Sequence, residues 1–237
     1  MAREISIKSN NQNGIKPRDL RSNDDIQVRL QAEFGRLDFE GYTFDVKRGE
    51  AATGHTISNE QAGKLLLAFD LEEPWSCHQT YKVFDEQYAE IFARPEVDAY
   101  RIIVLSKIME LIEGRLDKIQ NAPLAHYGLT KYVVLAALKK LISTDELGSK
   151  VCREPRVLFR GERLEGFLKL VDYLLLSAII DLNHEVAQGQ LADYKSELKS
   201  RNSVEKIIAE LLRSYEKDRA RGKADSVSAR LAECGIR

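Results

Sequence analysis

Three residues in the stretch LDFEGYTFDVKRG, at positions 37–49, could form the site of a metal-dependent nuclease. Nucleases with a PD-(D/E)xK pattern hold a divalent ion between an acid on one strand and an acid-x-Lys group on the next, and the lysine stabilises the developing charge. Asp38, Asp45 and Lys47 follow this order. However, the two acids stand only seven positions apart and no third acid is evident, so a hairpin with ordinary surface charges gives the same letters. A small nuclease is therefore an alternative hypothesis.

A second group of candidate residues lies upstream, in SNNQNGIKPRDLRSNDD at positions 9–25. Side-chain amides both donate and accept hydrogen bonds, so beside a strand end they can satisfy a tight turn or read a ligand, including base edges. The neighbouring cations could contact phosphates. The candidate binding residues are Asn10, Asn11, Gln12, Lys16, Arg18, Asp19 and Arg21. Structural capping and recognition of a nucleic-acid or protein partner both remain open for this group.

The histidines and cysteines are scattered along the chain, at His55, His78, His126, His184, Cys77, Cys152 and Cys234. They show neither HxxxH spacing nor a CxxC pair, which argues against a zinc site, a Cys-His catalytic couple and a disulfide framework, and favours a reducing compartment. The sequence also lacks a P-loop and a GxGxxG fingerprint. We therefore expect no metal, no cofactor and no catalytic residue.

The composition is that of a globular protein without a strong net field. Of 237 residues, 43% are hydrophobic and 31% are charged, and the formal net charge is −1. These values exclude wholesale disorder, and a nearly neutral chain attracts nucleic acid or anionic lipid only through local patches. The apolar run at 173–180 is shorter than the ~20 residues that span a bilayer. Because the N-terminus also lacks the apolar segment of a signal peptide, we expect a cytoplasmic protein with no membrane partner.

Two segments show the alternating apolar pattern of half-buried strands, namely EISIK at 4–8 and GYTFDVKRG at 41–49. A helix is predicted between them, because Pro17 suits a helix start and an apolar stripe over 26–34 ends near Gly35. Two strands alone are marginal in water. We therefore expect the sheet to continue into a partner chain, into the helices or into upstream residues of a longer protein, and we predict that 1–56 is a small, truncated strand-helix-strand α/β segment. An oligomerising helical scaffold is a further hypothesis.

Helical periodicity dominates the rest of the chain, which is predicted to form an all-helical domain at 57–237. TGHTIS, at 53–58, is predicted to be a loop, after which Ser58 or Asn59 should cap a helix that stops before Pro74. The predicted fold class is thus mainly α, a helical bundle with a small N-terminal α/β piece of two short strands.

Further signals concern individual helices of this bundle. QTYKVFDEQYAEIFA, at 79–93, has aromatic residues at helical spacing, and we assign this stripe to the core rather than to base stacking. Asn202, with Glu205 three residues later, is predicted to open a late helix that ends before Gly222. A last short helix is expected from about residue 225.

The segment IKSNNQNGIKPRDLRSNDDIQVRLQAEFGR, at 7–36, resembles the abortive-infection phage-resistance (AIPR) family of bacteria. The resemblance rests on an Asn-rich NxQ after a strand, an Asp-Leu, a polar Ser-Asn and a helix with Gln, that is, on Asn10, Asn11, Gln12, Asp19, Leu20, Ser22, Asn23 and Gln27. It continues through YTFDVKRG, ISNEQAGKLLLAFDLEEPW and VFDEQYAEIF, and covers about residues 4–112.

Longer members of this family carry an N-terminal region that resembles restriction endonucleases, and nothing like it precedes REISIK in this chain. The resemblance therefore implies the C-terminal part of such a protein, and nuclease activity is not carried over to it. The leading hypothesis is a non-enzymatic module of a phage-defence protein that binds a nucleic-acid or protein partner through its N-terminal piece. Homo-oligomerisation, or association with a missing N-terminal half, is also expected from this interpretation.

Overall fold

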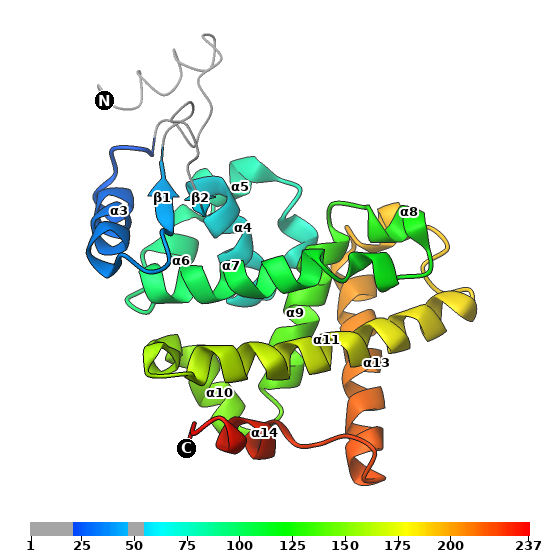
Figure 1. Cartoon of the computed structure of the whole chain (residues 1–237). Helices are drawn as coiled ribbons and strands as arrows, with labels where there is room; N and C mark the ends of the chain where they lie inside the picture. Colours follow the sequence, from blue (N-terminus) through cyan, green and yellow to red (C-terminus); the bar gives the residue numbers. More distant parts are fainter. Residues whose placement is uncertain (1–20, 47–54) are drawn as a thin grey trace.

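The computed structural model describes residues 21–46 and 55–237, and this part of the chain is mainly α-helical (Figure 1). The described elements follow in chain order as α3 (Asp25–Leu37), β1 (Thr43–Asp45), β2 (Thr56–Ser58), α4 (Asn59–Phe69), η2 (Pro74–Ser76), α5 (Thr80–Phe84), α6 (Tyr88–Phe92), α7 (Ala99–Glu113), η3 (Leu116–Lys118), α8 (Ala122–Ala125), α9 (Thr130–Ile142), α10 (Glu146–Arg153), η4 (Pro155–Phe159), α11 (Arg163–Ala187), α12 (Tyr194–Glu197), α13 (Arg201–Ala220) and α14 (Val227–Glu233). The predicted fold class, a helical bundle with a small N-terminal α/β piece, is confirmed.

The described sheet consists of β1 and β2, which run parallel. Phe44 pairs with Ile57 in register, and both side chains are buried. The ring of Phe44 stacks on Phe34 of α3, with 5.3 Å between ring centroids. This apolar face fixes the register, because a shift by one residue would turn both side chains away from the core. The first predicted strand, at 4–8, lies outside the described residues.

The prediction of a loop at 53–58 is wrong for its last three residues, which form β2. Thr-Ile-Ser contains a single apolar side chain, so it is too short to show the two-residue alternation that identifies a strand. Its strand conformation comes from pairing with β1, which sequence periodicity does not report. The predicted division at residue 56 falls inside this strand.

Helix α3 forms where the apolar stripe predicts it. The Asp24 side chain caps its first turn by accepting a hydrogen bond from the backbone N–H of Ile26, at 3.1 Å. Leu30 and Phe34 are buried on one face. The helix ends at Asp38, whose φ of 39° is left-handed and turns the chain toward β1. Pro17, the predicted helix start, lies outside the described residues, and the described helix begins only at Asp25, because residues 21–24 form a turn that ends in the Asp24 cap.

Helix α4 begins at the predicted cap. The Ser58 hydroxyl accepts a hydrogen bond from the backbone N–H of Gln61, at 3.1 Å. Replacing Ser58 by alanine should lower the free energy of unfolding by about 1 kcal/mol, because one N–H of the first turn loses its partner. Urea denaturation of the variant measures this loss. Ser58→Asp, which can still cap, should retain most of the stability, and equal losses in the two variants would show that the cap contributes little.

Two other helix boundaries differ from prediction. The stripe at 79–93 is not one helix, since the chain breaks at Asp85 (φ −121°, ψ −80°) into α5 and α6. Phe84, Tyr88 and Phe92 are buried as predicted, but the prediction is wrong for Tyr81, the first ring of the stripe, which is 50% exposed. Helix α13 is capped by Ser200 instead of Asn202, because the hydroxyl of Ser200 already accepts the N–H of the first turn.

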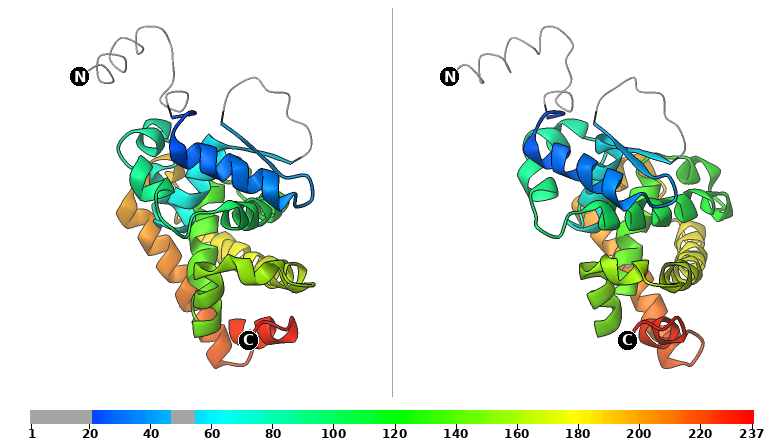
Figure 2. Two further views of the ribbon diagram at one scale, coloured as in Figure 1. Left: turned by 90° about the vertical axis from the view of Figure 1, so that its left-hand side faces the viewer. Right: turned by 60° about the vertical axis from the view of Figure 1, so that its left-hand side comes forward.

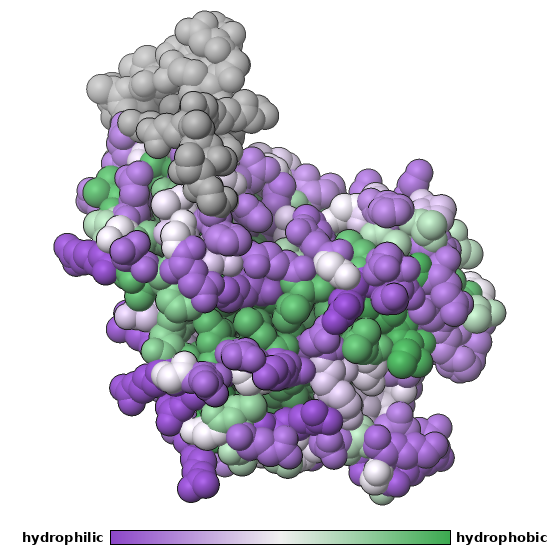
Figure 3. All heavy atoms as spheres, in the orientation of Figure 1, coloured by the Kyte–Doolittle hydropathy of each residue, from purple (hydrophilic) through white to green (hydrophobic). Residues whose placement is uncertain are grey.

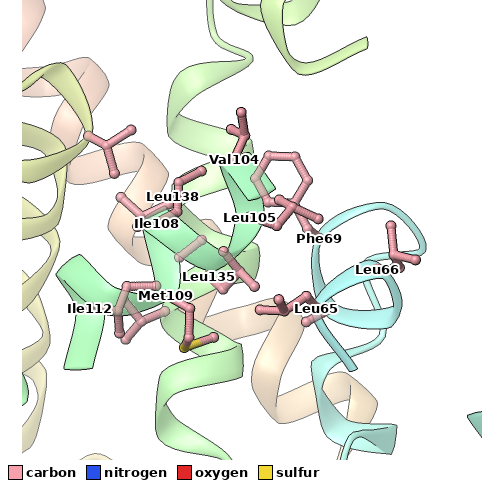
Figure 4. Close-up of a cluster of buried hydrophobic side chains, with 14 of the residues drawn as sticks. Leu65, Leu66, Phe69, Val104, Leu105, Ile108, Met109, Ile112, Leu135 and Leu138 are labelled. Atoms are coloured by element: carbon pink, nitrogen blue, oxygen red, sulfur yellow. The ribbon is translucent and has the colours of Figure 1, made fainter. Parts of the chain in front are cut away.

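The core lies where α4, α7 and α9 cross, with α11 and α13 packed around them (Figures 1 and 2). Figure 4 shows Leu65 of α4 pointing toward Leu135 of α9, and Phe69 of α4 lying beside Leu105 of α7. The buried side chains form one cluster that runs from Leu30 in α3 to the C-terminal segment. Within the described chain, 21–46 and 55–237, no helix combines the length and the apolar content needed to cross a membrane.

Candidate functional site

Five rings from four separate parts of the chain make successive contacts. His55 stacks on Tyr42 at 4.8 Å between centroids, and Tyr42 lies 6.5 Å from Phe39. Phe39 meets Phe159 edge to face at 4.9 Å, and Phe159 meets Tyr100 in the same way at 4.7 Å. We call His55, Tyr42, Phe39, Phe159 and Tyr100 the aromatic row. It joins the N-terminal α/β piece to α7 and η4.

Most of the aromatic row reaches the surface. His55 is exposed, and Phe39, Phe159 and Tyr100 are each half-buried. Tyr42 is the buried member, at 3% exposure, and its hydroxyl donates to Glu110 at 2.8 Å. Burial, together with that hydrogen bond, raises the pKa of Tyr42, so the phenol stays neutral. Figure 3 shows that the face carrying α7 and α11 also exposes hydrophobic residues between the two helices.

A tight turn projects Phe39 from the end of α3. Asp38, Glu40 and Gly41 have φ values of 39°, 49° and 72°, all in the left-handed region. Glycine adopts this region freely, whereas the two acids accept strain there. A hydrogen bond from the backbone N–H of Tyr42 to the carbonyl of Phe39, at 2.9 Å, closes the turn. The turn therefore holds Phe39 and Tyr42 on the same side of the chain.

Two cations lie over the aromatic row. The Lys107 ammonium is 5.6 Å from the centroid of Phe39 and 5.3 Å from that of Tyr42. The Arg156 guanidinium is 5.4 Å from the centroid of Tyr100. Each cation is attracted to the ring below it, because the face of an aromatic ring carries partial negative charge. Each cation also pairs with a carboxylate, Lys107 with Glu40 at 2.5 Å and Arg156 with Asp98 at 2.6 Å.

A run of basic residues continues from the row through α10 and η4 into the start of α11. Residues 150–163 contain five cations against two acids, Glu154 and Glu162. The cations are spaced three or four positions apart, at Lys150, Arg153, Arg156, Arg160 and Arg163. Four of them are exposed and Arg163 is half-buried. The basic run itself therefore has five positive and two negative side chains, a net charge of +3, although the whole chain is almost neutral.

A cavity of about 400 Å³ adjoins Tyr42 and contains both acids of the nuclease hypothesis. Asp38 and Asp45 line it together with Gln31 and Thr43. The hypothesis also needs Lys47, which lies outside the described residues. Among the residues that the structure describes, no three His, Cys, Asp or Glu side chains gather as metal ligands. The fit to a divalent ion is thus partial, with two carboxylates and one amide oxygen on the cavity wall.

Of the predicted binding residues, the structure describes Arg21. Its Nε donates to the carbonyl of Phe84 at 3.1 Å, and its guanidinium lies 4.4 Å from the centroid of Tyr88. A carboxylate oxygen of Asp24 is 3.7 Å away. Arg21 therefore anchors the start of α3 to α5 and α6. The other six predicted residues, Asn10, Asn11, Gln12, Lys16, Arg18 and Asp19, lie outside the described part of the chain.

Two of the three cysteines offer no nucleophile at neutral pH, although all three are free thiols. Burial raises the pKa of Cys152 to about 11 and also raises the pKa of Cys77, so both remain protonated. Cys77 donates to the carbonyl of Lys64, and the adjacent His78 bonds to the carbonyl of Trp75. These contacts are local and structural.

Sequence reasoning missed the aromatic row because its members are far apart in the chain. The spacing of Phe39, Tyr100 and Phe159 carries no shared period. A local signal existed in the basic run at 150–163, whose cations recur every three or four positions beside a phenylalanine. A comparison of the chain with protein-family models, curated proteins and solved structures finds no match.

Proposed function

We propose that this chain is a non-catalytic module that binds single-stranded nucleic acid along the aromatic row. The observation that carries the proposal is the row itself, with half-exposed rings flanked by Lys107 and Arg156 and followed by the basic run at 150–163. Proteins that bind single strands combine a basic path for the backbone with aromatic faces for the bases. A duplex hides its base faces, so half-exposed rings favour an unpaired strand.

The nearly neutral net charge is compatible with this function. Non-specific binding depends on the phosphates that local cations neutralise, and the basic run contains Phe159, a member of the row. The ion pairs of Lys107 and Arg156 hold those two side chains over the rings. Base stacking then adds affinity that tolerates any base sequence, because every base has a π-face.

Phe159→Leu should weaken binding of a short fluorescein-labelled oligothymidine about tenfold, since one stacked base contributes about 1–3 kcal/mol. The ring edges are lost while the apolar volume is largely kept. Fluorescence anisotropy at low salt measures the dissociation constant. Tyr81→Leu is the matched control, because Tyr81 is also a surface aromatic, at 50% exposure, but lies outside the row. Equal affinity of the Phe159→Leu variant and the unsubstituted chain would contradict the proposal.

The basic run is tested by the salt dependence of the same titration. Arg160→Gln should make the slope of log K against log salt less steep by about 1, because one phosphate contact is lost. The preference among bases should not change. Lys195→Gln, which removes an exposed cation outside the basic run, should leave the slope unchanged. An unchanged slope in Arg160→Gln would show that the run does not follow the strand.

The resemblance to the AIPR family supports placing this module in phage defence, in the cytoplasm, as a homo-oligomer. Phage plated on bacteria that express the chain should then form fewer plaques than phage plated on bacteria that express the Phe159→Leu variant. Equal plaque numbers would remove the defence role while leaving nucleic-acid binding to be judged by anisotropy.

A second candidate function is a small metal-dependent nuclease, which the shared cavity of Asp38 and Asp45 favours. These carboxylates would hold Mg²⁺, which would supply Lewis-acid activation of a phosphodiester. Any Mg²⁺-dependent cleavage of a labelled oligonucleotide should disappear in Asp45→Asn and persist in Asp117→Asn, which changes an exposed acid outside the cavity. Cleavage that survives Asp45→Asn would assign it to another site or to a contaminant.

A further inference from the structure

The single tryptophan of the chain lies in a groove between η2 and α13, above α9. The groove has a volume of about 430 Å³. Its apolar surface comes from Leu71, Trp75, Ala136, Ile208, Ala209 and Leu212. Its rim carries charged side chains, namely Glu72, Glu73, Lys140, Arg201 and Glu205. We call this the Trp75 groove, and it shares no residue with the aromatic row.

A guanidinium already occupies part of the Trp75 groove. Cζ of Arg201 lies 5.6 Å from the centroid of the Trp75 ring. Its Nε donates to Glu205 at 2.8 Å, and the charge of Glu73 adds a second attraction. An indole face beside carboxylates is the usual setting for a bound cation. The contacts of Arg201 thus show which chemical group this groove accepts.

Arg201 is weakly held in this position. Its side chain is 70% exposed and that of its partner Glu205 is 51% exposed, and exposed ion pairs of this kind are weak. Arg201 is also the first residue of α13, where the positive end of the helix dipole disfavours a cation.

The acids of the rim differ in their availability. Glu72 is bound by Lys139 and Lys140. Burial alone would raise the pKa of Glu72, but the bonds to the two lysines outweigh it and hold the pKa below its usual value. Glu73 accepts a hydrogen bond from the side-chain amide of Gln87, at 3.1 Å. An amide is neutral, so this contact does not neutralise the charge of the Glu73 carboxylate. Glu73 is therefore available to a ligand, whereas Glu205 becomes available when Arg201 leaves it.

We propose that the Trp75 groove binds an arginine side chain of a partner protein, and that Arg201 is an internal occupant which this arginine displaces. The incoming guanidinium stacks on Trp75 between Glu73 and Glu205, and its methylene arm and neighbouring apolar residues contact Leu71, Ile208 and Leu212. Charge complementarity with the carboxylates and the geometry of Arg201 determine this occupant.

The fluorescence of the sole tryptophan reports binding directly. The full chain is titrated with an end-blocked tripeptide of leucine, arginine and leucine, and with the same tripeptide carrying citrulline, which keeps the shape but lacks the charge. The arginine peptide should change the fluorescence in a saturable way, and the citrulline peptide should bind at least tenfold more weakly. Equal binding of both peptides, or binding of neither, would overturn the proposal.

The Arg201→Gln variant tests whether Arg201 is displaced by the incoming arginine or has only a structural role. Removing the internal competitor should tighten binding of the arginine peptide at least threefold, whereas loss of a merely structural contact would weaken it or leave it unchanged. Glu73→Gln should weaken binding several-fold. Arg213→Gln is the matched control, since Arg213 is an exposed arginine of α13 that pairs with Glu210 away from Trp75, and it should leave the affinity unchanged. Unchanged or weaker binding by Arg201→Gln would refute displacement.

Discussion

Replacing Asp70 by alanine should lower the free energy of unfolding by about 3–5 kcal/mol, because it leaves buried positive charge without a counter-ion. The Asp70 side chain is 4% exposed. One carboxylate oxygen accepts from Arg101 and the other from Arg94, each at 2.8 Å. The side chain of Arg101 is 5% exposed, so water can compensate only a small part of the lost attraction.

The contacts of Arg101 extend this loss beyond a single ion pair. Its Nε donates to the carbonyl of Glu96 and a terminal nitrogen donates to the carbonyl of Arg153, at 3.0 and 2.6 Å. Arg101 belongs to α7, whereas Arg153 ends α10 and belongs to the basic run. If Asp70 is replaced and the guanidinium of Arg101 turns toward solvent, the hydrogen bond from Arg101 to the carbonyl of Arg153 breaks. This bond joins α7 to α10. The proposed nucleic-acid binding should then weaken indirectly, so Asp70 variants are unsuitable for testing that proposal.

Urea denaturation followed by circular dichroism measures the effect of Asp70→Ala. Glu96→Ala is the control, because Glu96 also faces Arg94, at 3.6 Å, but its side chain is 46% exposed. That surface pair should contribute at most about 1 kcal/mol. A loss in Asp70→Ala no larger than the loss in Glu96→Ala would show that water reaches the arginines.

The helices were predictable from sequence because the signals that form them are local. An apolar stripe and an acceptor at the first turn fix α3 at Asp24 and α4 at Ser58. The exceptions arise where tertiary contacts decide. β2 exists through its pairing with β1, and the break at Asp85 separates α5 from α6 although the aromatic spacing suits one helix.

The two proposed binding surfaces were not predictable for a related reason. The aromatic row and the Trp75 groove each combine residues from elements that are distant in sequence, and a single sequence contains no record of which helices will cross. Phe39 meets Phe159 across 120 positions. Sequence reasoning assigned aromatic residues to the core by their periodicity, which holds for Phe84 and Phe92. It has no means to identify rings that stand alone in turns and short helices.

Gly148→Ala should destabilise the fold by about 2–4 kcal/mol, because α10 approaches the end of α9 too closely for a side chain. A Cβ at Gly148 would lie 1.9 Å from the backbone oxygen of Ile142 and 2.9 Å from a methyl group of Val227. A backbone oxygen cannot rotate away as a flexible side chain can, so α10 itself has to shift and α14, which packs on it, moves as well.

Gly35→Ala is the matched control for this prediction and should have the opposite sign. Gly35 lies inside α3, and no atom lies within 4 Å of the place that an alanine methyl group would take. Alanine there should stabilise the helix by about 0.5–1 kcal/mol, since it loses less backbone entropy on folding. Both variants make the same chemical change in a helix, so the difference between their urea midpoints isolates the steric contact at Gly148. A stabilised Gly148→Ala variant would mean that α10 does not pack against the carbonyl of Ile142. The basic run begins in α10, so its position beside the aromatic row would then be wrong as well.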